Sequence, residues 1–222
     1  VLLTILRGEE RLDLTVTRKV IHSKVAEGRM LQDNIGYVRI SNFHESAGEE
    51  TVAEVEKLLE LGAEKLIFDV RSNPGGYVHE MVYALDYLLP EGPLFRSVNY
   101  NGVEDVKESD ADCLDLPMAV LMNGDTYSAA EFFAAALSEY DWAITVGEPT
   151  CGKGYYQTTW ELGDGSAVQL STGAYTTPNG VNLTEAGGLQ PDVPVEPAAA
   201  VAAAEEDPQI QAAVIALMEE SK

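Results

Sequence analysis

The chain has 222 residues, and its 37 acidic and 14 basic side chains give a formal net charge of −23. This charge would repel phosphate backbones and anionic lipid, and no apolar window reaches the roughly 20 residues of a membrane span, so we expect neither nucleic-acid binding nor membrane contact by this chain. With 45% hydrophobic residues the composition is globular, and a chain of this size can bury about 70% of its extended surface.

The first residues alternate between apolar and polar side chains. Leu12, Leu14 and Val16 follow a period of two, and the apolar run at 2–6 supplies a partner strand, so the pattern predicts a β-hairpin. An isolated hairpin is only marginally stable. We therefore expect this segment to be the last part of a larger module, followed by a connecting stretch that ends at Ile35.

Strand and helix patterns then alternate along the chain. Short apolar runs predict strands at 35–40, 65–70, 118–122 and 142–147, and helical spacing predicts helices at 49–61, 78–89 and 128–140. The stretch 155–175 is β-like and is broken by a turn at 163–165. This alternation favours an α/β core with appended hairpins.

The last segment predicts an amphipathic helix. Asp207 and Pro208 form an N-cap and first-turn pair after a connector rich in proline and alanine at 191–204. The apolar stripe of this helix consists of Ile210, Val214, Leu217 and Met218. Such a stripe fits docking on the chain's own core, and it equally fits pairing between two copies in a homodimer.

Three short motifs have simple local interpretations. Ser128 and Glu131 have the spacing of a capping box, and the Asn-Pro-Gly-Gly sequence at 73–76 is typical of a tight turn. Lys153 lies between two glycines but lacks the upstream glycine spacing of a phosphate-binding loop. Cys113 and Cys151 lack metal-ligand spacing. We expect no metal and no cofactor.

Taken together, the motifs resemble those of the carboxyl-terminal processing (tail-specific) protease family of Ser/Lys serine endopeptidases. The family's Asp-x-Arg-x-Asn-Pro-Gly-Gly stands here at 69–76, and its Ser-Ala-Ser-Ala-Ser-Glu corresponds to Thr-Tyr-Ser-Ala-Ala-Glu at 126–131. Its Gly-Glu-x-Thr-x-Gly-Lys-Gly stands at 147–154, and its closing Gly-x-x-Pro-Asp is similar to 187–193. The resemblance therefore spans essentially the whole chain.

The resemblance implies that Ser128 is the nucleophile and Lys153 its general base. Lys153 lies 25 positions after Ser128, and Gln157 lies four after Lys153, which is the family's order and spacing. A lysine can take the serine proton only as a neutral amine, so we expect a dry pocket around Lys153. Gln157 would hold that amine toward Ser128 without adding a charge. No recognised motif places the histidines: His22, His44 and His79.

A helix that starts at Ser128 would point the Ala129 N–H and the positive end of the helix dipole at a developing oxyanion. The resemblance assigns the second oxyanion donor to the Gly-Gly loop, and the sequence leaves both Gly75 and Gly76 open. We therefore hypothesise an acyl-enzyme on Ser128, formed and hydrolysed with Lys153 as general base and acid. Asp69 and Arg71 are expected to form the structural bonds that shape the loop.

The resemblance also implies the architecture and the setting. It implies a Clp protease/crotonase-like α/β core, with residues 1–20 as the end of a PDZ domain, 21–195 as the protease core and 196–222 as a connector with the amphipathic helix. The expected substrates are unfolded or C-terminally exposed proteins and peptides. The expected location is extracytoplasmic in a bacterium, in the periplasm, on the cell surface or secreted.

Three departures from the family pattern leave alternatives open. Tyr127 stands where alanine is common and would narrow or line the adjoining subsite, Ala130 replaces a frequent serine, and Cys151 replaces an aromatic residue and is expected to be a small buried side chain. One alternative function is a catalytically silent peptide-binding or regulatory fragment of the same fold. Another is an acyl-thioester enzyme of the Clp protease and crotonase group, which does not need the Ser/Lys pair.

Overall fold

A computed structural model describes residues 1–21, 23–197 and 207–220. Its centre is a six-stranded sheet in the order β12-β9-β8-β5-β4-β3. Its strands are β3 (Ala26–Met30), β4 (Ile35–Ile40), β5 (Lys65–Asp69), β8 (Met118–Met122), β9 (Ala143–Gly147) and β12 (Val193–Pro194). Neighbouring strands are parallel, except that β3 runs antiparallel to β4.

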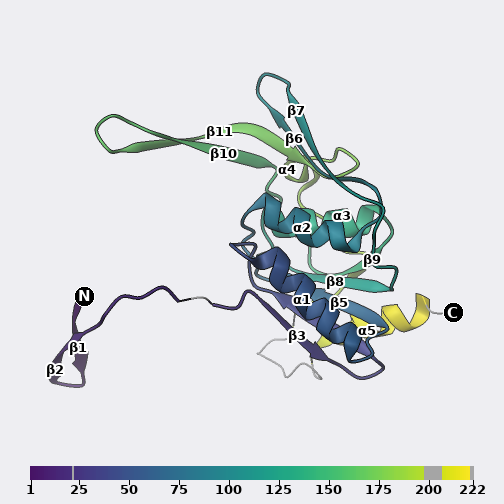
Figure 1. Cartoon of the computed structure of the whole chain (residues 1–222), viewed down its shortest axis with the longest axis horizontal. Coiled ribbons are helices and arrows are strands. Elements are labelled where there is room, and N and C mark those ends of the chain that lie inside the picture. The colour runs from purple at the N-terminus through teal and green to yellow at the C-terminus, as the bar shows by residue number, and fades with distance from the viewer. Residues whose placement is uncertain (22, 198–206, 221–222) are drawn as a thin grey trace.

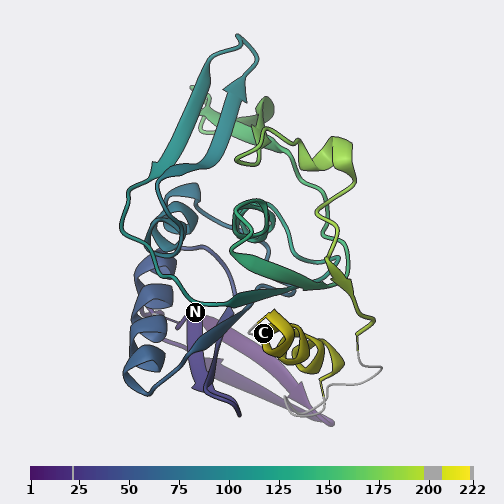
Figure 2. The same ribbon diagram turned by 90° about the vertical axis from the view of Figure 1, so that its right-hand side faces the viewer.

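Helices cover both faces of this sheet, which explains why its inner strands β5, β8 and β9 are largely apolar runs (Figure 2). The helices α1 (Ala47–Glu60), α2 (Val78–Leu88) and α3 (Ala129–Glu139) lie on one face, and α5 (Pro208–Glu220) lies on the other. Successive strand residues point to opposite faces. Phe68 accordingly packs in the core under the first three helices, whereas Ile67 packs with α5.

The last helix docks on its own core. Ile210, Ala213 and Leu217 are buried against the face formed by β8 and β9. The predicted apolar stripe is wrong at Met218, which is 43% exposed, and Ala213 is buried instead because it follows Ile210 by three positions.

A four-stranded sheet in the order β10-β11-β6-β7 lies beyond α2 and α3 and projects two hairpins away from the core (Figure 1). Its strands are β6 (Gly92–Asn99), β7 (Glu104–Ser109), β10 (Tyr155–Glu161) and β11 (Ala167–Thr176), and the short helix α4 (Leu183–Ala186) follows. The predicted hairpin at 155–175 is confirmed. Strands β6 and β7 were not predicted, because polar and apolar residues do not alternate regularly along them.

The first hairpin, β1 (Leu2–Arg7) and β2 (Glu10–Thr15), forms a separate two-stranded sheet at the end of an extended segment (Figure 1). Its predicted strands are confirmed. Large apolar side chains remain exposed on it, with Leu2 67% and Leu6 75% accessible. Its assignment to a PDZ domain stays a prediction.

The predicted α/β core is confirmed. The prediction for the residues just before β4 is wrong. Residues 26–30, expected to be a connecting stretch, form β3, which pairs along β4 as the antiparallel edge of the sheet. Glycine, arginine and glutamate in this strand hide its β character. His22 and the connector residues 198–206 lie outside the described residues.

The fold brings the three sequence motifs to one edge. Strands β5, β8 and β9 are parallel neighbours, so their carboxyl ends lie side by side. The loop at 70–77 follows β5, the loop at 123–128 follows β8, and the loop at 148–154 follows β9. In open α/β sheets ligands bind outside the carboxyl ends of the strands, and this edge is therefore the candidate site.

Candidate active site

The loop after β5 is fixed by a buried asparagine. Asn73 Oδ1 accepts the Gly75 N–H at 2.8 Å, and Asn73 Nδ2 donates to the Ile40 carbonyl at 2.9 Å. Gly75 has a φ of +84°, and a Cβ there would lie 2.7 Å from the Tyr127 carbonyl oxygen and 2.9 Å from the Ala129 nitrogen. Only glycine fits this close approach between the loop and the start of α3.

Ser128 lies at the sharp turn between β8 and α3. It is the N-cap of α3 with φ 55° and ψ −124°, a backbone conformation that non-glycine residues rarely adopt. Such strain persists only where the surroundings hold it, and it concentrates at functional sites. The predicted capping box with Glu131 is present. Ala129 is the first residue of α3, so its N–H has no acceptor within the helix.

Glu131 joins the nucleophile turn to the lysine loop. Its fully buried carboxylate accepts the Ser128 N–H at 2.8 Å and the Lys153 N–H at 2.9 Å. It also accepts the Thr150 hydroxyl at 2.7 Å and the Gly152 N–H at 2.6 Å. A buried carboxylate is stable only with such donors, so this one fixes both backbones relative to each other.

The wider role of Glu131 was missed in the sequence, where it served only as a capping partner. The sequence feature that predicts this role is the position of Glu131 in an apolar helix. Residues 129–137 of α3 are Ala-Ala-Glu-Phe-Phe-Ala-Ala-Ala-Leu. A helix that is apolar all round is buried, and a buried glutamate requires several donors.

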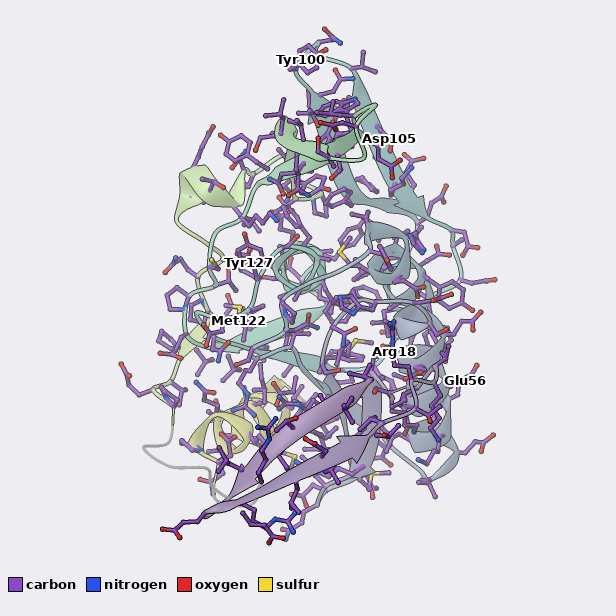
Figure 3. The ribbon with its side chains drawn as sticks, turned by 90° about the vertical axis from the view of Figure 1, so that its left-hand side faces the viewer. Arg18, Glu56, Tyr100, Asp105, Met122 and Tyr127 are labelled. Atoms are coloured by element: carbon purple, nitrogen blue, oxygen red, sulfur yellow. The ribbon has the colours of Figure 1, made fainter. Side chains whose placement is uncertain are left out.

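Lys153 lies in the loop after β9 and its residue is half-buried, less enclosed than the dry pocket we expected. Its Nζ lies 4.8 Å from the centroid of the Tyr127 ring, a cation–π contact. Figure 3 labels Tyr127 beside the start of α3 and Met122 at the end of β8. Thr184 of α4 fixes the loop on both sides of the lysine, because it donates to the Gly152 carbonyl at 2.8 Å and accepts the Gly154 N–H at 2.7 Å.

Gln157 lies on β10 and is exposed. Its amide donates to the Tyr155 carbonyl at 3.2 Å and to the Ser171 hydroxyl at 3.4 Å. Among the described residues no hydrogen bond joins Gln157 to Lys153. The proposed catalytic roles of Ser128, Lys153 and Gln157 stay predictions.

Two further side chains near the site are exposed. Cys151 was expected to be buried, and this is wrong because the loop after β9 turns its side chain outward. Partial burial, with the nearby carboxylates of Glu131 and Asp125, raises the pKa of the Cys151 thiol, which disfavours a reactive thiolate. His79 on α2 has a 75% exposed side chain that stacks on Tyr77.

Asp69 and Arg71 shape the loop after β5, as expected. The Arg71 Nη2 donates to Asp69 Oδ2 at 2.6 Å, and the Tyr37 hydroxyl donates to the same oxygen. Burial by itself would raise the pKa of the Asp69 carboxyl, but the Arg71 guanidinium and the Tyr37 hydroxyl outweigh it and lower that pKa. Burial and Asp69 raise the pKa of Tyr37 to about 12.

Neither a metal cluster nor a membrane helix is found in the part of the chain that the structure describes. No three His, Cys, Asp or Glu side chains gather there in a way that could hold a metal ion. No helix there has the length and apolar character needed to cross a membrane.

Comparison with known proteins agrees with this geometry. Residues 34–195 match the model of peptidase family S41, and these residues include all three loops of the site. The chain belongs to peptidase family S41. Its family and its Clp protease-like α/β core are thereby confirmed, with the core also supported by the solved structures below.

Two curated relatives are similar to most of the chain. It is 33% identical over 191 residues to the carboxy-terminal processing protease CtpA of Bacillus subtilis, an alignment that covers 85% of this chain and 41% of that protein. It is 35% identical over 191 residues to a carboxyl-terminal-processing protease of Synechocystis, covering 83% of this chain and 44% of that protein. The chain thus spans less than half the length of these relatives.

Solved structures share the fold. The photosystem II D1 C-terminal processing protease matches with a TM-score of 0.71 and 28% identity, covering 84% of this chain and 52% of that one. A structure described as a putative S41 protease from Bacteroides fragilis matches with a TM-score of 0.73 and 14% identity, over 99% of this chain and 65% of that one. The second likeness supports the fold alone.

Proposed function

We propose that this chain is the catalytic core of a serine endopeptidase that cleaves near the C-termini of protein and peptide substrates. The observation that carries the proposal is the buried Glu131 carboxylate, which holds the backbones of both Ser128 and Lys153. This arrangement fixes a strained serine at a helix N-terminus and a lysine on a neighbouring loop, as a Ser/Lys dyad requires.

The reaction follows from these groups. Ser128 Oγ attacks the carbonyl carbon of the scissile peptide bond while the Lys153 amine takes the hydroxyl proton. The C–N bond then breaks, and Lys153 gives that proton to the leaving amine. A water attacks the resulting ester, passing its proton through Lys153 to Ser128 Oγ as the acid product leaves.

The structure favours one of the two glycines as the second oxyanion donor. The Gly75 N–H donates to Asn73, so it is occupied. Phe43 bonds to the Gly75 carbonyl and to the Tyr77 N–H, which leaves the N–H of Gly76 directed away from Phe43. Among the described residues no hydrogen bond uses the Gly76 N–H. We therefore assign the oxyanion hole to Ala129 and Gly76.

Gln157 completes the proposal as the residue that steadies the lysine. In the free structure the Lys153 amine rests on the Tyr127 ring, and the Gln157 amide bonds within its own hairpin. Catalytic hydrogen bonds are often loose without substrate and tighten in the reacting complex. We propose that substrate binding moves the amine from the ring of Tyr127 to Ser128, where Gln157 can hold it.

The remaining parts of the proposal concern the parent protein. We propose that residues 1–20 complete a PDZ domain, that the substrates are unfolded or expose their C-termini, and that the protein works outside the cytoplasm of a bacterium. The exposed apolar side chains of β1 and β2 support the first point, since a larger domain would cover them.

Cleavage of an unfolded protein such as casein, followed by mass spectrometry, tests this function. We expect fragments with the native chain and none with Ser128→Ala. Paired peptides with a free or an amidated C-terminus test the direction to C-termini, and the free acid should be cleaved faster. Unchanged cleavage by Ser128→Ala would overturn the proposal.

A second candidate is a silent peptide binder of the same fold. The observation that favours it is the contact of the Lys153 amine with the Tyr127 ring. A binder would hold the casein peptides without cleaving them, and substitution of Ser128 would leave that binding unchanged.

A further inference from the structure

Arg71 connects the loop after β5 to the first turn of α5, a part of the chain 136 residues away. Its Nε donates to Asp69 Oδ1 at 2.9 Å, and its Nη1 donates both to Asp207 Oδ2 and to Gln209 Oε1 at 2.8 Å. The Arg71 side chain is 15% exposed and that of Asp69 is fully buried. The guanidinium is therefore held from two directions in a largely dry setting.

The two partners on α5 are themselves fixed. Asp207 Oδ1 caps the helix by accepting the N–H groups of Gln209 at 2.9 Å and Ile210 at 3.3 Å. Gln209 is only 1% exposed, and its Nε2 donates to the Val195 carbonyl at 2.8 Å. Each side chain thus uses one atom to anchor itself and another to hold Arg71.

Arg71 lies in the same loop as the oxyanion donor, five residues before Gly76. Ser72, the next residue, has a φ of 57°, and its N–H donates to Asn123 Oδ1 at 2.8 Å in the nucleophile loop. Asn73 then orients Gly75. A change in the Arg71 backbone would therefore be passed along a few tightly bonded residues to the Gly76 N–H.

We propose that Asp207 and Gln209 are positioning residues for the reaction: they act through Arg71 to hold the Gly75–Gly76 loop in its reactive geometry. This inference rests on the proposed function. Because an oxyanion forms only in the transition state, a shifted donor lowers kcat and leaves KM nearly unchanged. The last helix is then part of the catalytic apparatus as well as part of the core.

Asp207→Asn separates the two roles of this residue. Asparagine keeps the Oδ1 that caps α5, but it replaces Oδ2 with an NH₂ group. This group is a donor and does not accept the hydrogen bond from Arg71 Nη1. We expect kcat for a peptide substrate and the rate of Ser128 phosphonylation by a fluorophosphonate to fall about tenfold, with KM within about twofold of the native value. Gln209→Met, which removes the Oε1 acceptor, should lower kcat in the same way.

Leu217→Ala is the matched structural control, because it removes a buried side chain more than two turns further along the same helix. It should lower the melting temperature, while the rate of phosphonylation per folded molecule stays native. Equal losses of rate in Asp207→Asn and Leu217→Ala, in proportion to stability, would overturn the inference. Native kcat in both folded Asp207→Asn and Gln209→Met would also overturn it. Neither result touches the proposed function, which is tested separately by the reaction of the native chain and of Ser128→Ala.

Discussion

The two sides of the candidate site are held in different ways. On the nucleophile side, Gly75, Ala129 and Glu131 are buried, and loop and helix touch through backbone atoms. On the lysine side, Glu131 fixes the backbone of Lys153, but the side chain is half-buried against Tyr127. On the nucleophile side the backbone that carries Ser128 and the Ala129 N–H is thus held by close contacts, whereas on the lysine side the reacting amine lies at the end of a half-buried side chain.

This difference suggests that the two sides of the site have different roles in the reaction. Groups that stabilise developing charge are most effective when they need no reorganisation during the reaction, and the buried side meets that condition. A base must carry a proton from serine to the leaving group and later from water back to serine, and a side chain on a less enclosed loop retains the freedom to do so. The comparison predicts that changes on the rigid side affect both fold and rate, whereas changes on the lysine side affect rate alone.

The largest effect on rate is expected from Lys153→Ala. Loss of a general base lowers turnover by about 100 to 10,000-fold. Stability should stay close to native, because the fold uses the Lys153 N–H, which alanine retains. Lys107→Ala, on the exposed strand β7, serves as the control and should retain full peptide turnover. Turnover of Lys153→Ala within threefold of native would contradict the dyad.

Glu131→Gln should affect both rate and stability. The glutamine NH₂ cannot accept a hydrogen bond, so it leaves buried N–H groups of the two loops without a partner. We expect a loss on the order of 3 kcal/mol in the free energy of unfolding, measured by urea titration, and a loss of about 100-fold in kcat. A native free energy of unfolding for Glu131→Gln would contradict this account, because it would mean that the carboxylate does not hold the nucleophile side together.

Gly75→Ala tests the close approach on the rigid side directly. The added Cβ would meet backbone atoms at 2.7 and 2.9 Å, and the φ of +84° disfavours any side chain. We expect kcat to fall about 30-fold as the loop moves away from α3. Gly163→Ala, where nothing lies within 4 Å of the added Cβ, is the matched control and should leave kcat unchanged. Equal behaviour of the two variants would contradict the account.

Gln157→Ala should have a smaller effect. One hydrogen bond to the lysine is worth about 1 kcal/mol, so we expect kcat to fall about five- to tenfold with native stability. Gln169→Ala, on the neighbouring strand β11, is the control in the same peptide assay. A native kcat in Gln157→Ala would remove this residue from the catalytic set and leave the lysine side without a positioning group.

The smallest effect at neutral pH comes from the titration of Asp69. Its folded pKa is lowered, so its contribution to stability is complete above the ordinary carboxyl pKa of about 4 and is lost as the pH falls below that value. Urea titrations between pH 3 and 7 should show stability falling toward acid. Asp69→Asn, if it folds, should show a shallower fall in that window, and an identical fall would contradict the proposed pairing with Arg71.

Much of the core could be predicted because its signals are local. The apolar run at 118–122 predicted β8 with its observed bounds, and Asp207 and Pro208 predicted the start of α5. The strand β3 was not predicted from the sequence, because it is an edge strand of mixed polarity and becomes a strand only by pairing with β4. The hairpin β6–β7 was also not predicted, because polar and apolar residues do not alternate regularly along its strands.

The residues of the site could be predicted from the sequence, but the hydrogen bonds that connect them could not. The motifs pointed to Ser128, Lys153 and the glycine loop, since each is a short local pattern. The four bonds of Glu131 and the contact of Arg71 with α5 join segments far apart in the chain, and only the packed fold brings them together. The outward side chain of Cys151 likewise depends on the path of a loop.

The central claim is that Ser128 is a nucleophile activated within this chain. The most direct test is the intact mass of the protein after exposure to a fluorophosphonate probe, comparing the native chain with Ser128→Ala and Lys153→Ala. We expect a single adduct on the native chain, located at Ser128 by peptide mapping, and none on either variant. A folded native chain without any adduct, or an adduct that persists in Ser128→Ala, would contradict the account.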